Sequence, residues 1–297
     1  MWRHVLVGVN EQPGGRDAIA LGKDLLTEGG ELTLAHVHLS EAKPTRGSNP
    51  DFDAAERQRS RELLEAARTE SGVDAALAWT GSPSVGRGLH ELTERLGADL
   101  LVVGSNSYGL LGRVMIGDDT RDALNGAPCA VAVAPAAYSE RPVHWREIGV
   151  GYDGPPESEH ALEVAREMAS ELGAKVSAFQ AVSLPFSGPG AGEVIPQLVE
   201  NARTRIAALG DVEPHAAYGA AAEELALYGA SVDLLIVGSR GYGPIGRLVH
   251  GSTSQRLAHT ARCPVLVLSR ATKSSGDPGT TDADHDTTAT ATATATM

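Results

Sequence analysis

The chain has 297 residues, enough for two domains of about 150 residues each, and a formal net charge of −13. That acidity disfavours nucleic acids and anionic membranes as partners, and two cysteines are too few for a disulfide framework. The sequence has no apolar run of about 18 residues and opens on a run too short for a secretory signal, so we expect a cytoplasmic chain without a membrane span.

Short apolar runs alternate with amphipathic stretches through the first half of the chain. They predict strands at Val5–Val9, Leu32–Leu39, Val73–Trp79, Leu100–Val103 and Ala130–Ala134, and helices around Gly15–Leu26, Ala54–Glu70, Val85–Leu96 and Thr120–Asn125. The second half repeats this alternation. Its predicted strands are Ile148–Tyr152, Val176–Ala181, Glu213–Tyr218, Leu234–Val237 and Val265–Leu268, and its helices lie around Ser158–Leu172, Gln197–Leu209, Ala221–Tyr228 and Thr253–Thr260. Strands that are apolar on both faces and separated by helices indicate a parallel sheet covered on both sides.

The two halves are copies of each other. Asp99–Pro135 and Asp233–Ser269 align without a gap at an offset of 134 positions, with 15 identities in 37 positions. We therefore predict two α/β domains related by duplication, at residues 1–139 and 140–270. Residues 271–297 follow with Thr-Ala alternation and without Leu, Ile, Val or an aromatic residue, so we expect a disordered tail.

Each copy ends on an apolar fifth strand that would form a sheet edge, Ala130–Ala134 in the first copy and Val265–Leu268 in the second. Exposed apolar edges favour aggregation. We therefore expect the two copies to pack face to edge as an intramolecular pseudo-twofold pair. A homodimer of the whole chain is a second arrangement that the sequence leaves open.

A segment containing several glycines follows the fourth strand of the second copy. It reads Gly238-Ser239-Arg240-Gly241, then nine residues, then Gly251-Ser252-Thr253-Ser254. Glycines let main-chain N–H groups approach a phosphate, and the second cluster offers hydroxyls and N–H groups at a helix start, where the dipole favours an anion. No Lys stands at P-loop spacing, and the segment follows the fourth strand of its unit rather than the first. The P-loop and Rossmann fingerprints are therefore excluded.

The spacing G-2x-G-9x-G-S/T resembles that of the ATP-binding universal stress proteins, with Gly238, Gly241, Gly251 and Ser252 at its defined positions. Asp153, after the first strand of the second copy, is similar to the family's Asp that holds ribose or adenine. The resemblance implies a Rossmann-like α/β fold, similar to the adenine nucleotide alpha hydrolases. Each copy would be an open parallel five-stranded sheet in the order 3-2-1-4-5, with helices on both faces and nucleotide over strands 1 and 4. The implied ligand is ATP, with ADP and AMP as alternatives, with or without Mg²⁺.

The expected nucleotide-binding residues all lie in the second copy. They are Asp153, Ala181, Gly238, Ser239, Arg240, Gly241, Gly251, Ser252, Thr253 and Ser254.

The first copy departs from this pattern at the positions that matter. Asn10 replaces the Asp, Ser107 replaces the second glycine, and Asp118 and Asp119 replace the Ser-Thr pair. Two like charges about 4 Å apart cost about 4 kcal/mol at an effective dielectric near 20, so a carboxylate pair would repel a triphosphate. Residues 104–128 hold two Arg and three Asp, whereas residues 238–262 hold four Arg and no acid. We expect the first copy to be a scaffold and the second to bind one nucleotide.

Several of these interpretations have a structural alternative. Gly238 and Gly241 can simply shape a tight turn, and Arg240 can be a solvated loop cation. Arg247 recurs as Arg113 in the first copy, which favours a structural role. The ten histidines show no metal-ligand spacing, so we expect no metal site.

The resemblance, and the lack of a visible general base or metal-binding carboxylate pair, favour a nucleotide-binding regulatory or sensing protein of the stress response without strong turnover. One alternative is a slow ATPase or nucleotidyl-transfer enzyme on the same fold, although the His-x-x-His and Ser-Gly-Gly-x-Asp-Ser strings of adenylating relatives are absent. The other is a nucleotide-free interaction module, which nucleotide retained through purification would exclude.

Overall fold

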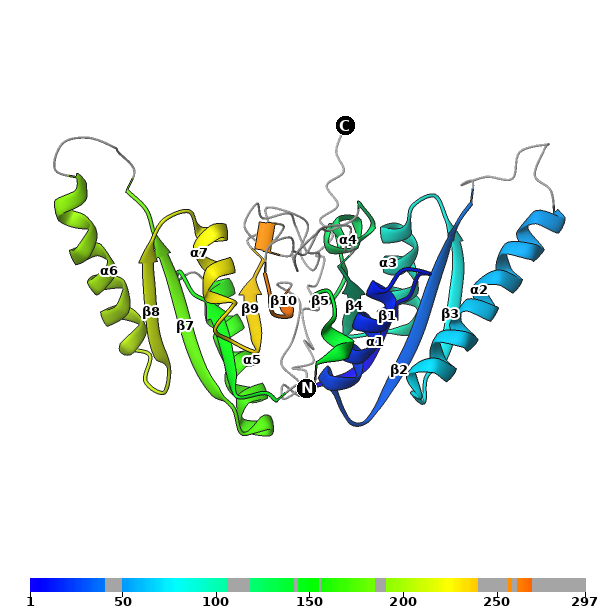
Figure 1. Cartoon of the computed structure of the whole chain (residues 1–297), viewed down its shortest axis with the longest axis horizontal. Coiled ribbons are helices and arrows are strands. Elements are labelled where there is room, and N and C mark those ends of the chain that lie inside the picture. The colour runs from blue at the N-terminus through cyan, green and yellow to red at the C-terminus, as the bar shows by residue number, and fades with distance from the viewer. Residues whose placement is uncertain are drawn as a thin grey trace, which may run out of the picture.

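The structure, a computed structural model, describes residues 1–40, 50–105, 118–141, 144–154, 156–184, 191–239, 256–257 and 261–268. Its strands form one ten-stranded sheet in the order β3-β2-β1-β4-β5-β10-β9-β6-β7-β8 (Figure 1). The strands are β1 (Trp2–Gly8), β2 (Leu26–Leu39), β3 (Ala76–Ser82), β4 (Leu100–Gly104), β5 (Ala130–Ala134), β6 (Glu147–Gly151), β7 (Lys175–Val182), β8 (Glu213–Tyr218), β9 (Leu234–Gly238) and β10 (Val265–Leu268). Each repeat has the predicted order 3-2-1-4-5, and the strands within each repeat are parallel.

Helices fill the connections between these strands. In the described ranges they are α1 (Gly14–Leu25), α2 (Pro50–Ser71), α3 (Val85–Leu96), α4 (Asp118–Leu124), α5 (Pro156–Leu172), α6 (Ala191–Ala207) and α7 (Ala221–Tyr228), with a 3₁₀ turn at Tyr138–Glu140. Helix α3 has the predicted bounds because both of its ends are encoded locally. The Ser84 hydroxyl accepts a hydrogen bond from the Arg87 N–H, and Gly97 ends the helix at φ 65°.

The strand predicted at Val73–Trp79 lies three residues further along, as β3. Helix α2 extends to Ser71, and Gly72 then reverses the chain at φ 60°. Residues 73–75 connect this turn to the strand without pairing, so pairing with β2 begins at Ala76. The pattern of apolar residues alone does not reveal this offset.

The expected face-to-edge contact between the repeats is wrong, because the two sheets join edge to edge. Strands β5 and β10 lie side by side at the centre of Figure 1 and pair antiparallel, with Val133 opposite Val265 and Val131 opposite Val267. This pairing satisfies the main-chain hydrogen-bonding groups of both apolar edges at once. The pseudo-twofold relation of the repeats is as expected.

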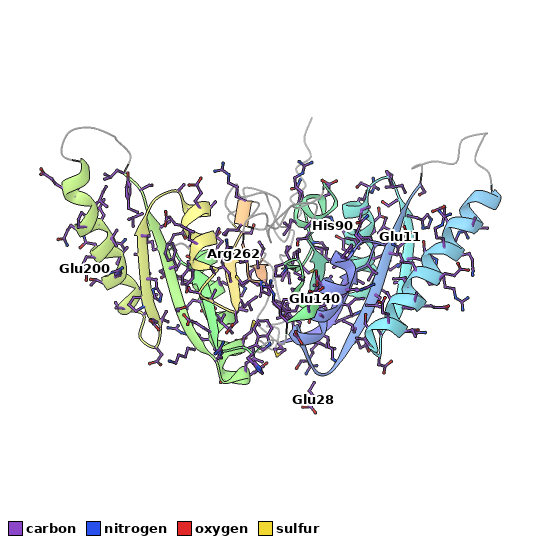
Figure 2. The ribbon with its side chains drawn as sticks, viewed as in Figure 1. Glu11, Glu28, His90, Glu140, Glu200 and Arg262 are labelled. Carbon is purple, nitrogen blue, oxygen red and sulfur yellow. The ribbon has the colours of Figure 1, made fainter. Side chains whose placement is uncertain are left out.

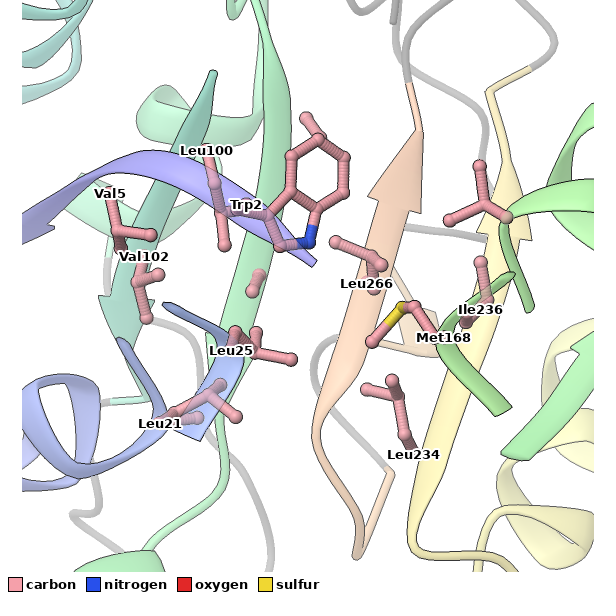
Figure 3. Packing of buried hydrophobic residues seen from close by; sticks show 14 of the residues in the cluster. Trp2, Val5, Leu21, Leu25, Leu100, Val102, Met168, Leu234, Ile236 and Leu266 are labelled. Carbon is pink, nitrogen blue, oxygen red and sulfur yellow. The ribbon is translucent and has the colours of Figure 1, made fainter. Parts of the chain in front are cut away.

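Both faces of the sheet are covered, each by one apolar cluster that runs through both repeats. One cluster lies under α1, α2, α5 and α6, and the other under α3, α4 and α7. Figure 3 shows the first cluster near the junction, where Trp2 and Leu25 of the first repeat face Met168 and Leu266 of the second. Because the cores merge across the junction, we expect the repeats to unfold together.

The segment that joins the repeats is anchored on α1. Asp17, only 4% exposed, accepts hydrogen bonds of 2.9 Å from the main-chain N–H groups of Ala137 and Ser139. The Ser139 hydroxyl donates to the same carboxylate at 2.7 Å, and the Tyr138 hydroxyl donates to Asp24 at 2.9 Å. These contacts hold the start of the connecting segment against the first repeat.

Most of the described charged side chains other than Asp17 lie on the outside of the molecule, as Glu11, Glu28 and Glu200 illustrate in Figure 2. Within the described ranges, no helix combines the length and the apolar character needed to cross a bilayer.

Candidate functional site

The carboxyl ends of β6 and β9 lie side by side in the second repeat. The two strands are paired, with Gly151 opposite Val237. The chain leaves β6 toward α5 and β7 on one side, while β9 continues toward β10 on the other. This reversal of strand order is the place where open parallel sheets bind ligands. The structure brings Asp153, Gly238 and Ser239 to this edge.

Asp153 lies two residues beyond β6, where a serine holds it. The Ser158 hydroxyl donates to Asp153 Oδ1 at 3.1 Å and accepts from the N–H groups of Asp153 and Gly154 at 3.3 and 3.2 Å. Gly154 has φ 92°, a conformation that favours glycine. Ser158 is 4% exposed, so a buried hydroxyl holds the exposed Asp153 against the start of α5. Ser158 was not among the expected site residues, although a Ser five residues after the Asp is a readable signal.

Gly238 ends β9 at a point of very close packing. A Cβ atom there would lie 2.7 Å from the carbonyl carbon and 2.9 Å from the Cβ of Glu157, in the first turn of α5. Gly104 occupies the same place in the first repeat, where a Cβ would meet the main chain of Gly14. Gly238 therefore has a packing role of its own, because both repeats need a glycine at this position whatever they bind.

Ser239 and Ala181 flank this position. Ser239 is 3% exposed, and its N–H donates to the Leu268 carbonyl at 3.0 Å, which extends the pairing of β9 with β10. Ala181 lies on β7 two residues beyond Phe179, the register partner of Gly151. It is therefore at the same edge as Asp153, half-buried against the apolar cluster under α7.

The other expected site residues, Arg240, Gly241, Gly251, Ser252, Thr253 and Ser254, lie outside the described residues, as does Ser107 of the first repeat. Their contribution stays a prediction from sequence. In the first repeat, Asp118 and Asp119 begin α4, a helix of seven residues.

The first repeat has a cavity at the equivalent edge. It has a volume of about 70 Å³ and is lined by residues that include Asn10, His36, Val37 and Gly104. Ligand pockets usually measure about 300–1,000 Å³. The His36 ring bonds the Val9 carbonyl through Nδ1 at 2.8 Å. Within the described residues this cavity is smaller than the usual ligand pocket, and the scaffold role of this copy stays a prediction.

A polar cluster at the opposite, amino edge of the second repeat was also missed. Ligand atoms of Glu147, Glu213 and His215 lie within 4.8 Å of one another. Glu213 and His215 lie two residues apart on β8, but Glu147 lies on β6, 66 positions before Glu213, so no spacing motif reveals the full set. Strand register alone assembles them.

Comparison with known proteins identifies the family that this chain matches. A model of the universal stress protein family matches residues 1–135 and 144–269. A universal stress protein of Mycobacterium tuberculosis is 32% identical over 182 residues, which cover 57% of this chain and 61% of the relative. The chain thus spans less than two thirds of the length of that relative.

Solved structures agree on the fold. The crystal structure of a universal stress protein from Archaeoglobus fulgidus aligns with a TM-score of 0.63 at 18% identity and covers 91% of this chain and 99% of its own. A universal stress protein crystallised in complex with cAMP aligns with 43% of this chain and 100% of its own, at 26% identity and a TM-score of 0.32. The first alignment shows that the α/β fold extends through both repeats.

Proposed function

The chain belongs to the universal stress protein family, and we propose that it binds one adenine nucleotide per chain, in its second repeat, where β6 and β9 end. ATP is the expected ligand, with ADP and AMP as alternatives, and the nucleotide would bind with or without Mg²⁺. The bound nucleotide would serve a regulatory or sensing role without strong turnover.

The observation that carries this proposal is that Asp153 and Gly238 lie at the same edge of the sheet, where the paired strands β6 and β9 end. A carboxylate held by Ser158 can accept hydrogen bonds from ribose hydroxyls or from the adenine amino group. Gly238 opens the segment in which the sequence places further glycines, hydroxyls and four arginines without an acid. A sugar-and-base anchor beside a phosphate-favouring segment fits an adenine nucleotide.

The asymmetry between the repeats supports a single site. In the first repeat Asn10 stands at the position of Asp153, and it accepts a hydrogen bond from the Gln12 N–H at 3.1 Å. An amide oxygen carries no full charge, so it is a weaker acceptor for a sugar hydroxyl than a carboxylate. The two acids that begin α4 oppose a phosphate as well.

Two measurements on the purified full chain test the proposal. Mass spectrometry of small molecules released on denaturation should detect an adenine nucleotide, and calorimetric titration should give a stoichiometry of one. Asp153→Asn, which installs the residue found in the first repeat, should weaken binding at least about tenfold, because it removes a charged acceptor. The matched change Asn10→Ala should leave affinity unaltered.

Other outcomes would overturn the proposal in distinguishable ways. Two nucleotides per chain, or loss of binding in Asn10→Ala, would place binding in the first repeat. No bound nucleotide in either experiment would favour the interaction module. Phosphate release at rates above about 1 s⁻¹, in the usual range of enzymes, would favour the enzyme.

A further inference from the structure

We propose that the second repeat binds a divalent transition metal ion of the Zn²⁺ class through Glu147, Glu213 and His215, at the edge of the sheet opposite the proposed nucleotide site. Two carboxylate oxygens and one imidazole nitrogen form a mixed set that suits Zn²⁺, Co²⁺ or Ni²⁺ better than Ca²⁺ or Mg²⁺, which prefer oxygen alone. The site is independent of the nucleotide proposal.

Three neighbouring strands bring these side chains together. Glu147 begins β6 and Glu213 begins β8, while Ser177 on the intervening β7 is the register partner of Glu213. His215 lies two residues beyond Glu213 and therefore points to the same face of the sheet. Its Nε2 atom lies 3.6 Å from a carboxylate oxygen of Glu213. Rigid strands, rather than a loop, set the spacing.

A hydrogen-bonded chain positions the Glu147 carboxylate. The Ser177 hydroxyl donates to Glu147 Oε1 at 2.6 Å and lies 2.5 Å from the Tyr228 hydroxyl. A serine has one proton to donate and an ionised carboxylate has none, so Tyr228 donates to Ser177 and Ser177 to Glu147. The second oxygen of Glu147 remains as a ligand atom. Partners of this kind typically orient metal-binding carboxylates.

The sequence makes room for this chain of bonds. A Cβ atom at Gly149 would lie 2.8 Å from Tyr228 Cε1, so only glycine lets the tyrosine ring lie over β6. The ring stacks on Phe179 at 4.9 Å between centroids and lies 5.6 Å from the His215 ring at 43°. Burial raises the pKa of Tyr228 above its ordinary value. The aromatic contacts restrict the imidazole.

The ligand atoms are somewhat further apart than in a metal complex. Around Zn²⁺ they would be roughly 3.3–3.5 Å apart, whereas here they lie within 4.8 Å of one another, so side-chain rotations that bring them up to about 1.5 Å closer would close the site. The side chain of Glu213 is 60% exposed and that of His215 is 38% exposed, so an ion can reach both and Glu213 has room to rotate toward it. Lys175, the register partner of Glu147 on β7, is exposed.

The first repeat is an internal comparison. Its strand register places His4, Ala76 and Ala78 where the second repeat has Glu147, Glu213 and His215. The His4 ring instead bonds the Thr33 hydroxyl at 3.2 Å. One repeat thus has three ligands and the other has one, although both have the same backbone arrangement. The fold itself does not require the cluster.

Cobalt titration of the chelator-treated full chain tests the site. Co²⁺ should produce visible absorption bands of a four- or five-coordinate site, with one ion per chain, and Zn²⁺ should abolish them. His215→Ala and Glu213→Gln should each weaken Co²⁺ binding at least tenfold, and Tyr228→Phe about tenfold, because it frees Ser177 from its donor. His144→Ala, at an exposed histidine between the repeats, and Glu223→Gln, on α7, are the matched controls and should change nothing.

The proposal is overturned if no bands appear at millimolar Co²⁺, or if His215→Ala and Glu213→Gln bind as tightly as the wild type. It is also overturned if His144→Ala removes the bands, which would assign them to another histidine. Far-ultraviolet circular dichroism of each variant shows whether it is folded. Asp153→Asn should retain the bands, so failure here is separate from failure at the nucleotide site.

Discussion

Replacing Gly238 with alanine tests the close contact between β9 and the start of α5. The added Cβ atom would lie 2.7 Å from the carbonyl carbon of Glu157, whereas ordinary contacts begin at 3.4 Å. The first turn of α5 would therefore have to move by at least about 0.7 Å, because the Glu157 carbonyl group belongs to the main chain and cannot rotate away. The same movement would shift Ser158, which holds Asp153.

The expected cost follows from this overlap. Extra methyl groups forced into well-packed regions usually destabilise by about 1–3 kcal/mol. For a chain of this size, each kcal/mol lowers the melting temperature by about 2–4 °C, so Gly238→Ala should lower it by about 2–12 °C. Nucleotide affinity should fall too, as Asp153 moves with the helix.

Thermal unfolding monitored by circular dichroism measures this loss. Gly104→Ala, the same change in the first repeat, should show a similar loss although that repeat is not expected to bind nucleotide. Gly192→Ala is the matched control, because a Cβ atom there has no neighbour within 4 Å, and alanine in the helix gains up to about 1 kcal/mol. Wild-type melting temperatures in both Gly238→Ala and Gly104→Ala would refute the packing argument.

Three further predictions concern ligand binding, the end of the chain and pH. Ser252→Asp with Thr253→Asp should abolish nucleotide binding in calorimetry, because two carboxylates would face the phosphates; unaltered binding would mean that the site lies elsewhere. A chain ending at Arg270 should keep its melting temperature, since residues 271–297 contain no Leu, Ile, Val or aromatic residue that could offset the entropy of ordering; a large loss would show that they dock. Burial raises the pKa of Asp24 above its ordinary 3.8, so this carboxyl favours folding below pH 3.8 and loses that contribution as pH rises through the raised value. Melting curves across this range should show Asp24→Asn gaining on the wild type as pH rises, and a constant difference would contradict the assignment.

The sequence by itself determined the repeats and most of their elements. The bounds of β5, β8, β10, α3 and α7 agree with prediction because each is a short apolar run or amphipathic stretch between local stop signals. The order 3-2-1-4-5 came from the family resemblance. Asp153 and Gly238 could be singled out because strand ends are readable and parallel strands end at one edge.

Tertiary structure alone decided how the repeats meet and what each glycine contacts. An apolar edge strand can be covered by a face or paired with another edge, and nothing local distinguishes these; the structure pairs β5 with β10. The packing role of Gly238 depends on Glu157, which lies 81 positions earlier in the chain. The cluster of Glu147, Glu213 and His215 likewise exists only through the register of three strands, because contacts between segments distant in sequence leave no spacing pattern to read.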